Sequence, residues 1–312
     1  VLQSLYVAHE QVIVSVQSCG PFGCTESTKI DTDATAALRA AQPLGRWAGL
    51  TTYLDRGHLA VSEVAAEWQA AGSTGAFLGR LINLPFYKAM FFTLSYTFIV
   101  TPLTLIFGFA IAVAVNSAAR ALRGPLIFFT LLPMIVTPLV GSLILFWMID
   151  ARGILGAALQ WAAGDPDLSV KASTPLTWIM LMVYGVWHAA PFAFIVYYAG
   201  LQTVNKETLE AAVIDGASRW ERIRYVVLPH LLPLTTFIAL IQLMDNFRVF
   251  EPIVSFSAQA HATSLSWAIY NDLGGETRQL SSAAATSVLT IIGVAILLSP
   301  VLVRTWRDFS RK

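Results

Sequence analysis

Five long stretches without Asp, Glu, Lys or Arg limit what this chain can fold into more than any other feature. They are residues 89–115, 125–148, 175–201, 226–244 and 281–303. An α-helix needs about 20 residues to cross the roughly 30 Å of a membrane's hydrocarbon core, and each stretch has about that length. Charged residues make up only 12% of the chain, about half the proportion of a soluble domain. The sequence therefore predicts an all-α polytopic membrane protein.

A sixth apolar stretch, residues 1–16, is shorter and contains Glu10, and the chain does not begin with methionine. We expect it to be the remnant of a truncated first transmembrane helix, which would give the full protein six. The predicted organisation then continues with an extracytoplasmic segment, a transmembrane domain that contains a cytoplasmic loop, and a cytoplasmic tail. These are residues 17–85, 86–305 (with the loop at 202–229) and 306–312.

The distribution of basic residues orients the predicted helices. The loops and tail on one side hold ten Lys and Arg residues, and the short loops on the other side hold four. Because cytoplasmic loops carry the excess of basic residues, the loop at 202–229 and the C-terminus are predicted to be cytoplasmic. Cys19 and Cys24 then lie outside, where a disulfide is stable. A structural disulfide or two free thiols are the main interpretations, since two cysteines supply too few ligands for a metal site.

The chain lacks the patterns typical of an enzyme or a nucleic-acid binder. None of its five lysines follows a glycine, so it has no P-loop for a nucleotide. It has no Gly-x-Ser-x-Gly elbow, and its five histidines lack zinc-ligand spacing. The net charge is +1, without basic runs or interleaved aromatic residues, so nothing indicates nucleic-acid binding. We predict no catalytic residues, no metal site and no cofactor in this chain.

The loop at 202–229 combines charge, helix-forming residues and a central glycine. Thr203 or Asn205 can cap a short helix that begins near Lys206, and Gly216 permits a sharp change of direction. A second short helix would lead from there to the next membrane stretch. Two short helices at an angle would form a compact elbow that a soluble partner can bind.

The second helix is expected from residue 217 to about 224. The alternative to a partner-binding elbow is an ordinary amphipathic surface helix, stabilised by an ion pair between Glu221 and Arg224.

The loop also contains a recognisable motif. It reads Glu210-Ala211-Ala212, then Asp215-Gly216, then Leu228-Pro229, and it resembles the EAA signature of permease subunits of bacterial ABC importers, with Val226 where that signature usually has isoleucine. Residues 47–53, 199–220 and 246–251 are similar to segments of the carbohydrate-uptake branch, that of the maltose and glycerol-phosphate permeases. The resemblance runs from about residue 46 to the C-terminus, and residues 9–45 have no clear counterpart.

The resemblance implies a six-helix type I permease fold in a bacterial cytoplasmic membrane, within an ATP-driven importer of a sugar or sugar-derived solute. The implied partners are a second homologous permease, an extracytoplasmic solute-binding protein, and two copies of a cytoplasmic P-loop ATPase that hold the ATP and Mg. The ATPase would contact Glu210, Ala211, Ala212, Asp215, Gly216, Leu228 and Pro229. Glu210 would pair with an ATPase arginine, and Gly216 would be the pivot.

Polar groups within membrane stretches are candidates for a transport path, because their exposure to lipid is unfavourable. Six positions match the sugar-contacting positions of maltose-type permeases, and they fall on two helical faces. They are His188 and Phe192 on one face, and Ile241, Met244, Asp245 and Arg248 on the other. The structural alternatives are an i,i+3 ion pair for Asp245 with Arg248 and a hydrogen bond between helices for His188.

Arg248 and His188 together would favour an anionic sugar or a sugar phosphate, unless Asp245 neutralises Arg248. Two other classes of protein compete with an importer subunit: a self-sufficient secondary transporter or channel, and a membrane-embedded enzyme. The membrane stretches contain no carboxylate suited to a proton or sodium relay, which argues against the first. They contain no paired acid and base, which argues against the second.

Overall fold

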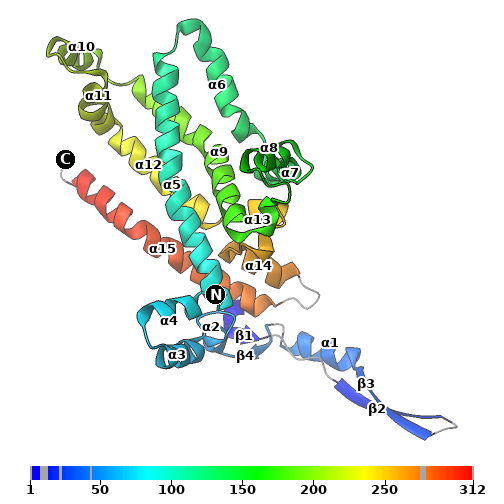
Figure 1. Ribbon diagram of the computed structural model, residues 1–312. Helices are drawn as coiled ribbons and strands as arrows, with labels where there is room; N and C mark the ends of the chain where they lie inside the picture. Colours follow the sequence, from blue (N-terminus) through cyan, green and yellow to red (C-terminus); the bar gives the residue numbers. More distant parts are fainter. Residues whose placement is uncertain (1, 8–12, 21–22, 43, 275–278, 311–312) are drawn as a thin grey trace. The chain divides into compact units, whose positions relative to one another are not determined.

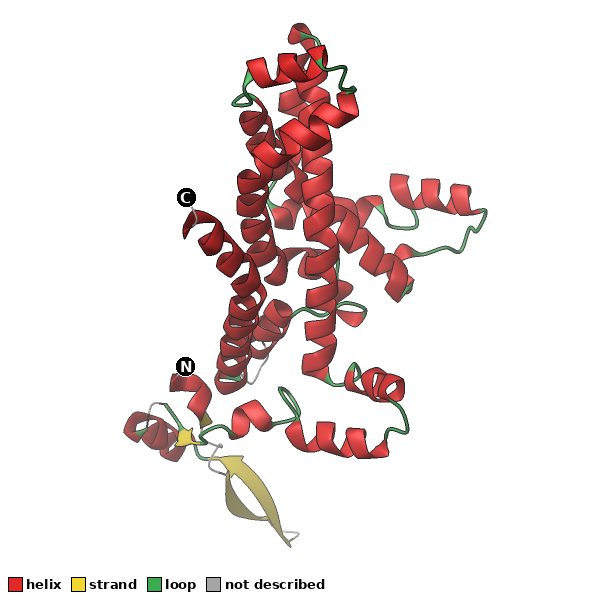
Figure 2. Cartoon of the chain, turned by 90° about the vertical axis from the view of Figure 1, so that its left-hand side faces the viewer, coloured by secondary structure: helices red, strands yellow, loops and turns green. Residues whose placement is uncertain are grey.

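The computed structural model describes residues 2–7, 13–20, 23–42, 44–274 and 279–310. The chain divides into two compact units, whose elements can be followed by their labels in Figure 1. The first comprises Val1–Lys88 and Ala268–Ile291, and the second comprises Ala89–Trp267 and Ile292–Lys312. Helices dominate the described residues, and the described strands all lie near the N-terminus of the sequence (Figure 2).

The first unit opens with a 3-10 turn and two antiparallel strand pairs. The turn is η1 (Leu2–Leu5); β1 (Tyr6–Val7) pairs with β4 (Arg46–Trp47), and β2 (Ile13–Gly20) pairs with β3 (Gly23–Ile30). The described part of residues 1–16 thus contains no α-helix, contrary to the predicted remnant of a transmembrane helix. The Val-Ile-Val-Ser-Val run at residues 12–16 explains the difference, because β-branched residues favour strands.

The hairpin of β2 and β3 bears on the two cysteines. Its register places Cys19 directly opposite Cys24. The Cα atoms of such partners are about 4.5–5.5 Å apart, which is within the range that a disulfide can bridge. The bond itself stays a prediction.

The remainder of the first unit is helical. Its elements are α1 (Thr32–Ala41), α2 (Thr51–Leu54), α3 (Val61–Ala70), α4 (Thr74–Leu81) and the parts of α14 (Leu265–Gly274) and α15 (Leu280–Ser310) that lie between residues 268 and 291. Buried His58 ties these parts together: its Nε2 lies 3.1 Å from both Ser282 O and Thr286 Oγ1. The segment before the first long helix therefore folds with residues near the C-terminus, a grouping that the sequence did not predict.

Four helices are long and apolar enough to cross a membrane, and they match four of the five predicted stretches. They are α5 (Pro85–Ser117), α9 (Thr174–Leu201), the continuous helical segment Arg219–Phe247, and the Leu280–Val303 part of α15. The remaining stretch, 125–148, is not one straight helix. It belongs to α6 (Arg120–Ile135) and α7 (Pro138–Met148), which are bent by 94° relative to each other, as in a broken span or a re-entrant loop.

The break between α6 and α7 has a local cause. Val136 and Thr137 both have extended backbone angles. Pro138 has no N–H to continue a helix, and its ring disfavours the helical conformation at the preceding residue. Pro102 and Pro191, by contrast, lie inside α5 and α9 without ending them, as membrane helices tolerate.

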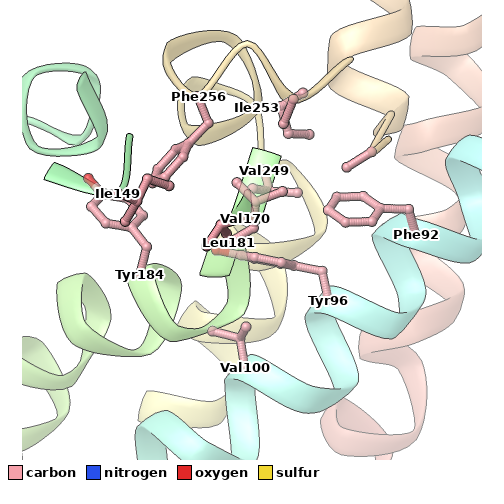
Figure 3. Close-up of a cluster of buried hydrophobic side chains, with 12 residues drawn as sticks. Phe92, Tyr96, Val100, Ile149, Val170, Leu181, Tyr184, Val249, Ile253 and Phe256 are labelled. Carbon is pink, nitrogen blue, oxygen red and sulfur yellow. The ribbon is translucent and has the colours of Figure 1, made fainter. Parts of the chain in front are cut away.

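Close packing holds the second unit together. Figure 3 shows one buried cluster, in which Phe92, Tyr96 and Val100 of α5 lie near Leu181 and Tyr184 of α9. Farther along the same pair of helices, a Cβ on Gly108 would lie only 2.5 Å from the Ala193 Cβ. Small residues are what allow two membrane helices to approach this closely. The shorter elements of this unit are α8 (Ile154–Ala163), η2 (Val170–Ala172), α10 (Lys206–Ile214), α13 (Glu251–Ser255) and η4 (Ala258–Ala260).

Candidate functional site

A cavity of about 600 Å³ lies within the second unit. It is lined by residues of α5, α6, α7, α9, α13 and α12 (Leu228–Phe247). The wall mixes apolar side chains such as Phe192 and Ile241 with amides, carboxylates, a guanidinium and an imidazole. A cavity of this size with a few converging polar groups is typical of a small-molecule site.

The cavity brings together most of the residues that the sequence predicted for a transport path. His188 and Phe192 of α9 line it together with Ile241, Asp245 and Arg248. Met244 does not line it; its side chain is 37% exposed elsewhere on α12. The face of α12 that lines the cavity is therefore rotated relative to the predicted one, and it includes Gln242.

Charge pairing inside the cavity removes the basis for the predicted anion preference. Arg248 Nη2 donates to Asp245 Oδ1 at 3.1 Å, so the carboxylate neutralises the guanidinium. Glu251, at the start of α13, is a second carboxylate in the wall and makes no ion pair among the described residues. The His188 Nε2 lies 3.4 Å from the carbonyl oxygen of Val136, which connects α9 to the bend between α6 and α7.

Several lining residues were missed by sequence reasoning. Asn246 is buried, and its Nδ2 donates to Thr101 Oγ1 of α5 at 3.0 Å. Tyr184 Oη donates to Pro138 O at 2.7 Å and so joins α9 to α7. Gln242 is only 5% exposed and stands one helical turn before Asn246. Two amides spaced by four residues in an apolar helix were a signal that could have identified this face.

The predicted cytoplasmic elbow lies at the start of the helical segment Arg219–Phe247, at the end opposite the cavity. It consists of α10 and α11 (Arg219–Arg222), and Figure 1 shows both at the end of α12 away from α13. Asn205 caps α10 by accepting a hydrogen bond from the Glu207 N–H at 2.9 Å. Gly216, between the two helices, has a φ of +80°, a left-handed conformation that favours glycine.

The second helix of the elbow differs from its prediction. It begins at Arg219 after a Ser218 capping box, in which Glu221 accepts from the Ser218 N–H at 2.7 Å, so Glu221 caps the helix rather than pairing with Arg224. It then widens into a π-helical turn, η3 (Ile223–Val227), where the Leu228 N–H donates to Ile223 O. Pro229 has no N–H, which prevents the regular α-helical bond to Tyr225 O.

The elbow presents unpartnered groups on its surface. Glu210 and Ala211 are exposed, and Glu210 makes no ion pair or hydrogen bond among the described residues. Apolar side chains are exposed beside them, with Ile214 85% and Trp220 68% accessible. Leu228 and Pro229 are exposed where α12 begins. Exposed apolar residues around a free carboxylate are typical of a protein-binding surface.

Comparison with known proteins identifies the fold and the family. A family model described as "Binding-protein-dependent transport system inner membrane component" matches residues 71–307. A trehalose/maltose transport system permease protein (MalF) of Thermococcus litoralis is 27% identical over 69% of this chain and 73% of its own length. An sn-glycerol-3-phosphate transport system permease protein (UgpA) of Rhizobium meliloti is 30% identical over 63% of this chain and 69% of its own.

A solved structure shares the fold. It is that of a bacterial ABC transporter involved in the import of the acidic polysaccharide alginate; it aligns with a TM-score of 0.65 at 19% identity, over 88% of this chain and 96% of that one. The family match covers most of the chain, including the elbow and the cavity, and favours an importer subunit over a self-sufficient transporter, a channel or an enzyme. This chain belongs to the inner membrane components of binding-protein-dependent transport systems, and it is a multi-pass permease subunit of an ABC importer.

Proposed function

We propose that this permease subunit translocates a sugar or a sugar-derived solute, with the cavity as part of the path and the elbow as the docking site for a cytoplasmic ATPase. The complete importer would contain a second homologous permease, two copies of the ATPase with their ATP and Mg, and an extracytoplasmic binding protein. The named relatives act on trehalose, maltose and glycerol phosphate, which supports this substrate class.

One observation carries the proposal. The exposed elbow and the cavity wall are joined by a single helical segment, Arg219–Phe247. The segment begins within the elbow and ends with Gln242, Asp245 and Asn246 in the cavity wall. At 1.5 Å per residue, the 26 steps from Arg219 to Asp245 span about 39 Å. A displacement of the elbow by an ATPase would therefore move one wall of the cavity directly.

Charge reversal at Glu210 tests the docking role. Glu210→Lys should abolish uptake in membrane vesicles and should stop the ATPase from copurifying with the tagged permease, because the lysine would repel an ATPase arginine. Asp167→Lys is the matched control: Asp167 is also exposed but lies in the loop after α8, and its reversal should leave both measurements unchanged. Normal uptake by the Glu210→Lys protein would contradict the proposal.

A further inference from the structure

Gln242 contributes to the cavity wall a polar side chain that no other described residue satisfies. Its side chain is 5% exposed, it lines the cavity, and it makes no hydrogen bond among the described residues. An amide side chain can donate and accept several hydrogen bonds, and without a protein partner these are left for water or a solute in the cavity. Buried polar groups are nearly always paired, so a group left open toward a cavity indicates a ligand that completes it.

The neighbouring amide adds a second polar group at the right spacing. Asn246 follows Gln242 by one helical turn and also lines the cavity. Its Nδ2 is held by Thr101 Oγ1, which fixes the amide and leaves its carbonyl oxygen as an acceptor. The two side chains together offer both donors and acceptors. This combination matches hydroxyl groups, which donate and accept at once.

The charges of the wall act against acidic solutes. The fully charged residues that line the cavity are Asp245, Arg248 and Glu251. Asp245 and Arg248 pair with each other at 3.1 Å, so Glu251 is left as an uncompensated carboxylate. A cleft with an excess of one sign concentrates ions of the opposite sign and repels those of the same sign.

We propose that Gln242 is a specificity-determining residue that hydrogen-bonds an uncharged, hydroxyl-bearing solute, and that Glu251 excludes anionic solutes from the same cavity. The inference rests on the proposed transport role of the cavity. It separates this chain from importers of acidic solutes, such as the alginate transporter with the same fold.

Thiol labelling in the assembled complex tests both halves of the inference. Ala189→Cys places a thiol in the cavity wall, in a background of Cys19→Ser and Cys24→Ser. The rates at which cationic, neutral and anionic methanethiosulfonates modify this thiol are measured at pH 8, where an ordinary histidine is uncharged. Each rate is divided by the rate of the same reagent with free 2-mercaptoethanol, which removes differences in intrinsic reactivity. The cationic reagent should react at least about three-fold faster than the anionic one. Glu251→Gln should remove most of that difference.

Protection by small polyols isolates Gln242. At high concentration, sorbitol should slow modification by the neutral reagent, whereas gluconate, its anionic counterpart at matched ionic strength, should not. Gln242→Leu should abolish the protection by sorbitol. Thr236→Val, a substitution in the same helix at a residue that does not line the cavity, should retain it. The free-thiol rate in each solution corrects for viscosity.

The outcomes distinguish a failure of the proposed transport path from a failure of the roles proposed for Glu251 and Gln242. If no reagent modifies the thiol introduced by Ala189→Cys, the cavity is closed to water, which would overturn the proposed transport path together with this inference. If the introduced thiol reacts, but the anionic reagent labels it as fast as the cationic one or faster, the charge exclusion alone would be overturned. Equal protection by gluconate, no protection by sorbitol, or protection that survives Gln242→Leu would overturn the role of Gln242.

Discussion

The elbow and the cavity wall lie at opposite ends of one helical segment and hold their polar residues in different ways. In the elbow, the polar contacts are local: Asn205 and Ser218 cap helices that begin at the next residue. In the cavity region, they join distant parts of the chain, as when Asn246 of α12 reaches Thr101 of α5. The elbow can therefore keep its shape while it moves, whereas the cavity wall depends on the arrangement of several helices.

Two glycines summarise this difference. Gly216 of the elbow has a φ of +80° and no atom within 4 Å of a built Cβ, so it serves backbone conformation. Gly108 of α5 is in a regular helix, and its Cβ would meet Ala193, so it serves close packing. Substitutions that change side-chain size at Gly108 or the preferred backbone conformation at Gly216 therefore test whether packing or conformation matters in each region.

The largest effect is expected in the packed region. Gly108→Ala should destabilise the folded protein by about 2–3 kcal/mol, because the added methyl group overlaps the Ala193 Cβ and the adjacent backbone of α9. Thermal melting of the detergent-solubilised complex measures this loss. Gly124→Ala is the control: Gly124 lies in α6 with no atom within 4 Å of a built Cβ, and it should be neutral or slightly stabilising. Equal melting of the two variants would refute close packing at Gly108.

In the elbow, conformation should matter more than size. Gly216→Val should reduce the coupling of ATP hydrolysis to uptake, since a β-branched residue in the left-handed region costs about 2 kcal/mol. Gly216→Asn should retain most of the coupling, because asparagine tolerates that conformation. The ratio of transport to ATP hydrolysis in proteoliposomes distinguishes them. Similar ratios for Val and Asn would mean that the backbone angle at Gly216 is unimportant for coupling.

A smaller effect is expected where one hydrogen bond joins two helices. Thr101→Val removes the acceptor for Asn246 Nδ2 and should lower the stability by about 1–2 kcal/mol, since a buried amide loses a partner. Thr236→Val is matched to it, because the Thr236 hydroxyl makes a solvent-exposed hydrogen bond within its own helix, to Leu232 O. Chemical denaturation of the two variants provides the comparison; a Thr236→Val protein that is equally destabilised would show that the contact with Asn246 contributes nothing.

The smallest effect is expected at the half-buried pair of Asp150 and Lys171. The hydrogen bond from Lys171 Nζ, at 2.9 Å, and the backbone N–H of Arg152 lower the pKa of the Asp150 carboxyl. A carboxyl whose pKa is lower in the folded protein stabilises the fold at pH values above its unfolded pKa of about 3.9. This stabilisation is lost as the pH falls through the folded-state pKa. Asp150→Asn should therefore lower the melting temperature slightly and equally from pH 6 to pH 8. A difference that changes within this range would show that another group is responsible.

The same contrast explains what the sequence could predict. The elbow was predictable because Asn205, Lys206 and Gly216 determine its structure within a few residues. The apolar stretches likewise revealed the long helices, since length and composition suffice to recognise them.

The cavity wall was only partly predictable, because membership of a face depends on how α12 is rotated against α5 and α9. Gln242 and Asn246 therefore escaped notice, although Ile241 and Asp245 beside them did not. The strands at the N-terminus were missed because a short apolar run was interpreted by its hydrophobicity rather than by its β-branched residues.

The π-helical turn at Ile223–Val227 affects how the elbow is oriented about the axis of α12. One residue more than a regular helix needs is accommodated between the elbow and α12, and each residue of an α-helix turns the chain by about 100°. Because the widened turn absorbs the extra residue, deleting one residue from it would restore a regular α-helix and leave Glu210 at nearly the same angle about the helix axis. Deleting one residue from the regular part of α12 before the cavity wall would instead turn Glu210 roughly a quarter of the way around that axis. The orientation of the docking surface relative to the cavity wall should therefore tolerate the loss of one residue from the π-helical turn, but not from the regular helix that follows it.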